Sequence, residues 1–169
     1  MTDTDINQAN NPETATMETA PLAPLILHAQ YIKDLSFENP NAPDSYRAGQ
    51  TSPQTDLSIN VDARKLDDPA IENLFEVTMK ISAKATREGK TIFLADILYG
   101  VTVSIHNIPE SQFHPMLLIE APRIAFPYAR KILGDLTQDG GYPPLLLSPV
   151  DFTALYLNRF GKKETDTTQ

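Results

Sequence analysis

The side chains that most often carry enzyme chemistry are few in this chain, and their spacing does not favour catalysis. The 169 residues include three histidines, His28, His106 and His114, and no cysteine. None of the histidines has a second histidine or a supported carboxylate at zinc-motif spacing. The nearness of Ser104 to His106 in sequence does not by itself place them face to face as nucleophile and base. No glycine-rich phosphate loop is present. We therefore expect no metal, no cofactor and no enzymatic activity.

The charge of the chain limits the partners that it can bind. The net charge is −8 and the isoelectric point is near 4.8, which disfavours nucleic acid and anionic membrane surfaces and favours a partner with a basic surface. The absence of cysteine excludes disulfides and is compatible with a reducing compartment. No apolar stretch approaches the roughly 20 residues that cross a bilayer. We expect a soluble cytoplasmic protein that does not insert directly into membranes and is not itself exported.

Composition divides the chain into one folded domain and two polar ends. Residues 1–24 are rich in Thr, Asn, Ala and Pro and contain acids but no Lys or Arg, which predicts a disordered acidic N-terminal arm. Residues 161–169 have almost nothing to bury, which predicts a mobile C-terminal tail. The folded domain is expected over residues 25–160.

Four segments of this domain alternate apolar and polar residues with the period of a β-strand. The later three segments are residues 57–63, 75–85 and 93–105, and the turn at residues 87–90 contains a Gly where a positive φ is needed. The third and fourth strands should therefore form an antiparallel hairpin. In the first strand the core face is expected to be odd-numbered, with Leu25, Leu27, Ala29, Tyr31, Leu35 and Phe37.

The fourth strand differs from the others because both of its faces are partly apolar. Ile92, Leu94 and Leu98 flank Asp96 on its even-numbered face, which would be mostly polar if it met only water. A loop or terminal arm of the same chain could cover this face, and so could a partner. The sequence leaves both alternatives open.

After Pro109 the apolar residues follow a helical period. The helical pattern continues to Leu136, and Pro122 and Pro127 within it predict a kink or two shorter helices. Residues 140–144 end this region, and residues 148–151 predict the start of a last helix. The fold class is α+β: a four-stranded antiparallel sheet with helices packed on one face. The apolar helix surface is wide enough that part of it is expected to lie between protomers.

Three motifs resemble the SecB family of protein-export chaperones in order and spacing. They are YIKDLSFE at 31–38 followed by PNAP at 40–43, AFPYAR at 125–130, and YPPLLLSPVDF at 142–152. The similarity extends from about Ala29 to Phe160. The resemblance implies a homotetramer, a dimer of dimers, that needs no ATP, binds unfolded secretory precursor proteins in the cytoplasm and delivers them to the translocation ATPase SecA.

The resemblance also implies a SecA-binding surface at Asp34, Glu38, Leu94 and Asp96. All four are even-numbered in strands whose odd-numbered positions are predicted to be core, so the strand pattern and the resemblance agree that they point outward. Relatives often have Glu at the position of Asp96. Acids of this kind mainly speed and orient the encounter with a basic partner.

By the same resemblance, the loop after the first strand and the last helix form the walls of a groove for nonnative polypeptide. The candidate groove residues are Phe37, Tyr46, Phe152, Leu155 and Tyr156, although each could equally be an ordinary core residue. A Trp that is common in this loop is missing, since the chain has no Trp.

Two other functions remain as alternatives. One is a SecB-like chaperone dedicated to a single partner, such as an antitoxin. The other is a small-molecule-binding α+β domain or enzyme, which a ligand-dependent rise in melting temperature would reveal.

Overall fold

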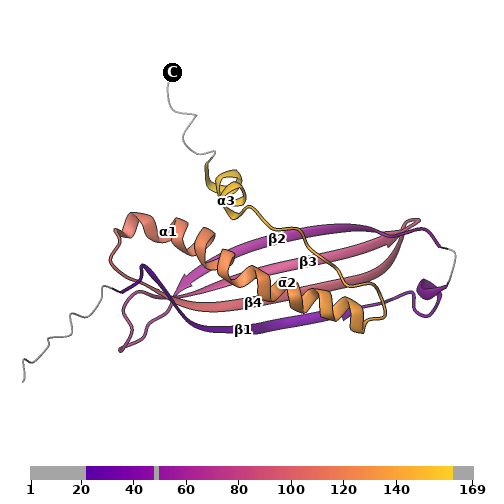
Figure 1. The fold of residues 1–169 in the computed structure, drawn as a ribbon, viewed down its shortest axis with the longest axis horizontal. Helices are drawn as coiled ribbons and strands as arrows, with labels where there is room; N and C mark the ends of the chain where they lie inside the picture. The colour runs from indigo at the N-terminus through magenta and orange to yellow at the C-terminus, as the bar shows by residue number, and fades with distance from the viewer. Residues whose placement is uncertain (1–21, 48–49, 162–169) are drawn as a thin grey trace, which may run out of the picture.

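The protein contains a four-stranded antiparallel sheet, as predicted (Figure 1). The computed structural model describes residues 22–47 and 50–161, and most of the predicted acidic arm and of the predicted tail lies outside these ranges. The strands are β1 (Leu25–Glu38), β2 (Gln54–Lys65), β3 (Leu74–Arg87) and β4 (Lys90–Ile105), in the spatial order β1-β4-β3-β2. Because β1 and β2 lie at opposite edges, the loop between them must cross from one side of the sheet to the other. This crossover loop contains a short helix, η1 (Asp44–Tyr46).

The hairpin between β3 and β4 has the two-residue turn that the sequence predicts. Arg87 pairs with Lys90, and the two residues between them have positive φ, 50° at Glu88 and 76° at Gly89. Two successive positive φ values are typical of a type I′ turn, whose twist matches that of the flanking strands.

Two register shifts in β1 alter the predicted core face of this strand. The shifts lie between Leu27 and Ala29 and between Ile32 and Asp34. Each shift reverses the alternation of side chains, so Tyr31 pairs with Gly100 and faces outward, while Ile32 pairs with Tyr99 and faces the helices. The prediction was therefore wrong for Ala29 and Tyr31. The second shift restores the predicted pattern from Asp34 onward.

The helical region after Pro109 contains several segments. They are η2 (Glu110–Gln112), α1 (Phe113–Pro115), the π-helical η3 (Met116–Glu120) and α2 (Ala121–Asp139). The interruption that the prolines predict is the π-helical stretch before Pro122, whereas Pro127 lies within α2 without ending it. Pro127 has no N–H to donate to the preceding turn, so one helical hydrogen bond is missing there.

The ends of the last two helices follow the predicted signals. α2 ends at Gly140, and Gly141 has a φ of 85° that favours glycine. α3 (Phe152–Phe160) begins at Asp151, whose carboxylate accepts a hydrogen bond from the backbone N–H of Ala154 at 2.9 Å. This contact is a standard N-cap.

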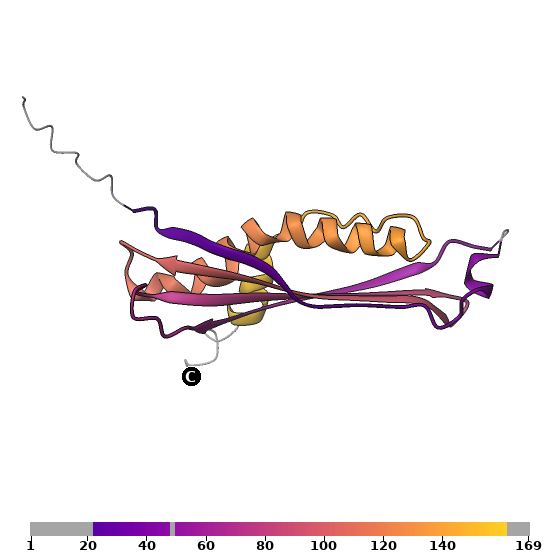
Figure 2. The same cartoon turned by 90° about the horizontal axis from the view of Figure 1, so that it is seen from below.

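The helices leave one face of the sheet without a cover in the described part of the chain. α2 packs along β4 on the face of the odd-numbered residues, and Figure 2 shows α2 on one side of the strands. α3 lies at the β2 edge, where the Arg159 guanidinium donates to the Val61 carbonyl at 2.7 Å. We call the opposite, even-numbered side of the sheet the outer face. Across the described residues, no helix has the length and apolar character needed to cross a membrane.

Candidate functional site

The four predicted SecA-binding residues lie together on the outer face. The strand pairing places Asp34 beside Leu98, Ser36 beside Asp96, and Glu38 beside Leu94. On its other side, β4 pairs with β3, and there Leu98, Asp96 and Leu94 lie beside a lysine, a serine and a second lysine, respectively. We call these nine residues the outer patch: Asp34, Leu98 and Lys80 in one row, Ser36, Asp96 and Ser82 in the next, and Glu38, Leu94 and Lys84 in the third.

The charges of the outer patch are accessible and unpaired. The acids of β1 and the lysines of β3 are exposed, and the side chains of β4 between them are half-buried. Among the ion pairs of the described residues, none involves a charge of this patch. The backbones of β1 and β3 are two strand spacings apart, about 10 Å. Lys33 and Glu76 bridge this separation at the other end of the face, but no ion pair of the described residues does so in the outer patch. The patch therefore presents unpaired groups of both signs.

The other end of the outer face has a closed network around Glu76. The Glu76 carboxylate accepts hydrogen bonds from the Tyr31 hydroxyl at 2.6 Å, from Lys33 Nζ at 2.8 Å and from Arg64 Nε at 2.5 Å. Its side chain is only 4% exposed. These bonds, with that of Lys33 the strongest, lower the pKa of Glu76 to about 2. The network links β1, β3 and β2.

The Tyr31 ring lies over a glycine of β4. A Cβ at Gly100 would be 2.6 Å from a ring carbon of Tyr31, so only glycine leaves enough room for the ring. Burial, together with the hydrogen bond to Glu76, raises the pKa of Tyr31 to about 12. Tyr31 was predicted as core, but it covers the strand from the outer side.

Two of the predicted groove residues belong to an aromatic cluster around the crossover loop. Phe37 stacks on Phe93 with centroids 5.7 Å apart, and Tyr46 lies 5.1 Å from Tyr142. Tyr142 also lies 5.1 Å from Phe93 and thereby joins the two pairs. The Tyr46 hydroxyl donates to the carbonyl of Gly140 at 2.6 Å. The loop cluster, Phe37, Tyr46, Phe93 and Tyr142, therefore holds the crossover loop against the end of α2.

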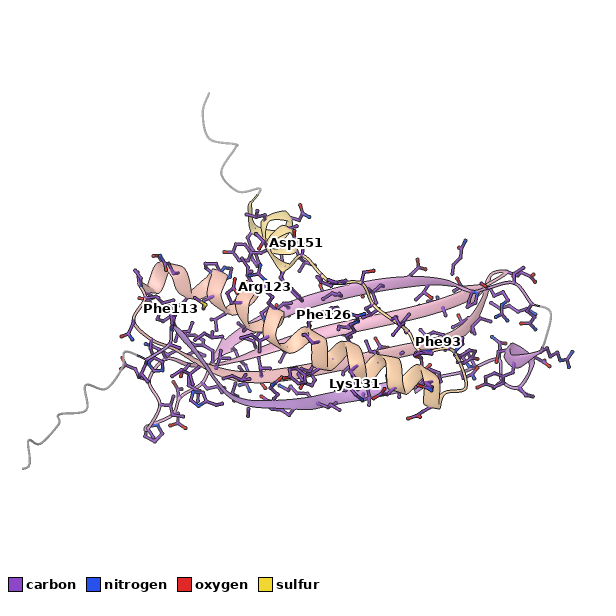
Figure 3. All side chains as sticks on the ribbon, viewed as in Figure 1. Phe93, Phe113, Arg123, Phe126, Lys131 and Asp151 are labelled. Carbon is purple, nitrogen blue, oxygen red and sulfur yellow. The ribbon has the colours of Figure 1, made fainter. Side chains whose placement is uncertain are left out.

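The other predicted groove residues lie on α3. Phe152 is 1% exposed and packs edge-on against Phe126, which Figure 3 labels on α2. Phe152 is therefore a core residue and offers no accessible surface. Leu155 and Tyr156 are half-buried, and the Tyr156 hydroxyl lies 2.8 Å from Nδ1 of His114.

A cavity of about 740 Å³, lined by both apolar and polar side chains, includes the His114 that Tyr156 contacts. Phe75, Ile108, Phe113, His114 and Leu117 are among the residues that line it. Its size suits several side chains of an extended polypeptide. The five predicted groove residues thus lie in three places: Phe37 and Tyr46 at the loop cluster, Leu155 and Tyr156 on α3, where Tyr156 contacts His114 of the cavity lining, and Phe152 in the core.

Ser104 is close to two histidines in space. Its hydroxyl oxygen lies 2.8 Å from Nε2 of His28 and 2.8 Å from Nε2 of His106. Ser104 is fully buried, so a substrate has no access to this hydroxyl. The contact thus satisfies a buried polar group, which is its ordinary structural role. Within the described ranges, no group of three His, Cys, Asp or Glu residues could hold a metal ion.

The chain is similar in sequence to a family of known proteins. The model of the family described as preprotein translocase subunit SecB matches residues 18–163. The chain belongs to the SecB family. It is 46% identical over 153 residues to the protein-export protein SecB of Maricaulis maris, which covers 90% of this chain and 87% of that protein. It is 43% identical over 164 residues to SecB of Caulobacter vibrioides, covering 97% and 96%. These findings confirm the predicted function in protein export.

A solved structure supports the same fold. A SecB-like chaperone of Mycobacterium tuberculosis, in complex with a ChAD peptide from the HigA1 antitoxin, superposes with a TM-score of 0.60. The match covers 75% of this chain and 90% of that chain at 18% identity. At this identity the likeness concerns the fold alone.

Several residues of the site were not singled out by the sequence. Lys80, Lys84 and Glu76 were recognised only as members of the polar face of a strand. Their role depends on which residues of β1 and β2 lie beside them, which the alternating pattern does not contain. Tyr142 stands in a quoted motif, but its contact with Phe93 is visible only in the structure.

Proposed function

We propose that this SecB-family chain is an ATP-independent holdase without enzymatic activity. In this proposal it works in the cytoplasm, binds unfolded secretory precursors, keeps them competent for translocation and delivers them to SecA. The observation that carries the delivery step is the set of unpaired acids on the outer face, away from the cavity on the helix side. Two partners can then be bound at the same time on different surfaces.

The SecA contact is assigned to Asp34, Glu38, Leu94 and Asp96. Their arrangement gives a basic segment three carboxylates around a half-buried leucine. Charges of this kind steer the encounter, and the leucine adds apolar contact. Converting Asp34→Lys and Glu38→Lys should weaken SecA binding at least tenfold and leave precursor binding intact. The matched control is Asp67→Lys with Glu72→Lys, which changes the net charge equally in the exposed loop between β2 and β3.

The precursor contact is assigned to the helix side of the protein. Tyr156 contacts His114, which lines the cavity, Leu155 precedes Tyr156 on α3, and Tyr46 is 47% exposed at the loop cluster. Several weak apolar contacts along one unfolded chain raise its overall affinity through effective concentration. Tyr156→Ala should weaken binding of an unfolded precursor several-fold more than the control Leu157→Ala on the same helix.

The tetramer, a dimer of dimers, is supported by apolar side chains that the single chain leaves exposed. Ile124 and Tyr128 of α2 are 42% and 52% exposed, and Ile32 of β1 is 45% exposed on the same side of the sheet. Exposed apolar residues that gather on one side mark an interface. A compact monomer at micromolar concentration in sedimentation would contradict this assignment.

The deciding experiment measures refolding of a denatured secretory precursor after dilution, with and without the chain and without nucleotide. We expect arrest at about one tetramer per precursor, and weaker arrest for a fast-folding precursor of similar composition, because fast folding buries the apolar segments first. Equal capture of fast and slow folders, or no arrest of either, would refute the holdase mechanism.

A further inference from the structure

We propose that Lys80 and Lys84 bind carboxylates of the partner that contacts the outer patch. The partner segment would then lie along β4 with basic side chains toward β1 and acidic side chains toward β3. This inference rests on the proposed SecA contact and deepens it, because it assigns the partner segment two chemically different sides.

The first observation is that the pattern of the outer patch repeats. Two of its three rows have the same order across the sheet: an acid on β1, a leucine on β4 and a lysine on β3. Asp34 and Glu38 are four residues apart, and so are Lys80 and Lys84, which corresponds to about 13 Å along the strands. An extended segment has side chains on alternating sides, with the same side recurring about every 7 Å. Such a segment can therefore meet both rows in register.

The second observation is that neither line of charges is neutralised within the described residues. Among the described residues that pair in register with these two lysines, Asp56 of β2 is the only carboxylate, and it lies opposite Lys84 without an ion pair. Lys80 pairs instead with the neutral Asn60. Asp96 of β4 lies diagonal to both lysines and is not in an ion pair with either of them. The Glu76 network shows that this sheet can pair charges across its strands where they lie close together. At the outer patch, a ligand has to supply the partners.

The third observation is the charge of the patch as a whole. It contains three carboxylates and two ammonium groups, so its net charge is only −1. A purely basic segment over β4 would gain from the acids but would meet the lysines at a comparable distance on its other side. A segment with both signs satisfies every charge. The leucines of β4 between them provide an apolar floor that strengthens these interactions by excluding water.

The test is the variant Lys80→Glu, with the affinity for SecA measured by calorimetry at low salt. If the partner needs an anion-binding group here, the variant binds about tenfold more weakly, even though the protein becomes more acidic. If the patch is simply an acidic surface for a basic partner, the same variant binds more tightly. Unchanged or tighter binding would overturn the inference while leaving the SecA contact itself intact.

The matched control is Lys65→Glu, which changes the net charge equally. Lys65 is exposed and pairs with Phe75, whose side chain lies on the helix side of the sheet. The affinity of the Lys65→Glu variant for SecA should differ less than twofold from that of the unchanged protein. The midpoint of urea unfolding, measured for both variants, excludes loss of fold as the cause, because both lysines are exposed and outside the ion pairs of the described residues.

A second measurement separates this inference from the proposed function. Two extended peptides are compared, one with alternating Lys and Glu around central leucines and one with Ser in place of each Glu. Methyl NMR shifts of Leu94 and Leu98 report where each peptide binds. Preferential binding of the Lys/Glu peptide supports the inference even if SecA does not bind, in which case only the proposed function fails. Equal or stronger binding of the Lys/Ser peptide refutes the inference.

Discussion

The two ends of the outer face treat their charges differently. At one end, the Glu76 carboxylate accepts hydrogen bonds from Tyr31 and Lys33 of one edge strand and from Arg64 of the other. At the other end, the acids of β1 and the lysines of β3 lie on either side of β4 and form no ion pair. Both ends are built on the same four strands and carry charges of both signs. They differ in one respect: only the first end has a carboxylate on β3, where donors from both edge strands, β1 and β2, can bind it. That carboxylate is Glu76, while the corresponding positions of the outer patch hold Lys80, Ser82 and Lys84.

From this difference we expect the end around Glu76 to contribute to stability, whereas the charges of the outer patch contribute little to it and stay accessible. A buried carboxylate with three donors is fixed by its partners, and its removal leaves them uncompensated. An exposed and unpaired charge contributes little to folding and keeps its full interaction for a ligand. The predictions below test this contrast.

The largest effect is expected for Glu76→Ala. Loss of this buried carboxylate leaves Lys33 and the Tyr31 hydroxyl without their hydrogen-bond acceptor. This should lower the free energy of unfolding by about 3–4 kcal/mol. Urea unfolding at one fixed protein concentration measures this, because the stability of an oligomer depends on concentration. The comparison variant is Asp96→Ala in the outer patch, which should cost about 1 kcal/mol or less. Equal losses in the two variants would remove the distinction between the two ends.

The second effect is a dependence of stability on pH that, of the two ends of the outer face, the end around Glu76 contributes. The pKa of Glu76 is lowered to about 2 from 4.5, so its contribution is complete above pH 4.5 and is lost as the pH falls toward 2. The loss should reach about 3 kcal/mol. The pKa of Tyr31 is raised to about 12 from 10.0, so its contribution is complete below pH 10 and is lost as the pH rises toward 12.

Unfolding midpoints between pH 2 and 12 check this dependence. Glu76→Gln should flatten the acid limb, and Tyr31→Phe should flatten the alkaline limb. If the unfolding midpoint of Glu76→Gln still falls as steeply at low pH, the loss of stability in acid comes from other carboxylates.

A smaller effect is expected for Gly100→Ala. The new Cβ would overlap the Tyr31 ring, which must tilt away and lengthen its bond to Glu76. Overpacking of this kind costs about 1–3 kcal/mol. Gly89→Ala offers a contrasting variant, because nothing lies within 4 Å of its Cβ and its cost comes from the backbone conformation alone. Tyrosine fluorescence should change in the first variant and not in the second.

The smallest effect on stability is expected for Asp34→Asn. Asp34 is exposed and belongs to no ion pair of the described residues, so the free energy of unfolding should change by about 0.5 kcal/mol or less. SecA association should nevertheless slow, and the difference from the unchanged protein should shrink as salt is raised, because exposed charges are screened. A stability change above about 1 kcal/mol would mean that Asp34 has a structural role like that of Glu76.

The strands and helix ends were predictable from the sequence because their signals are local. Alternation identified β2, β3 and β4, and Gly89, Gly140 and Asp151 marked a turn, a helix end and a helix start. The register shifts in β1 were not predictable, since they concern how β1 pairs with β4, a strand far away in the chain, and the alternation within β1 carries no information on that pairing. Asp34 was placed correctly because the two shifts cancel before it.

The candidate site was predictable in part for the same reason. Alternation and the family resemblance both placed Asp34, Glu38, Leu94 and Asp96 on one face. The roles of Lys80 and Glu76 require knowledge of strand order, which alternation does not encode. Phe152 was assigned to the groove because the resemblance places the last helix in the groove wall and because an aromatic residue offers adaptable apolar contact. Its burial and its contact with Phe126 show instead that it belongs to the core.

The order of strands in the sheet also has a consequence for the timing of folding. β3 and β4 are joined by a two-residue turn and β2 precedes them directly, so these three strands can pair early, whereas β1 pairs only with β4. Closing the loop between β1 and β4 is the slowest of these pairings. During synthesis at about 5–20 residues per second, β1 waits for seconds before β4 has left the ribosome. Two of the three acids of the outer patch come from β1, whereas its leucines come from β4, so the patch exists only once the sheet is complete. A partner that recognises the patch therefore distinguishes a finished chaperone from a nascent one.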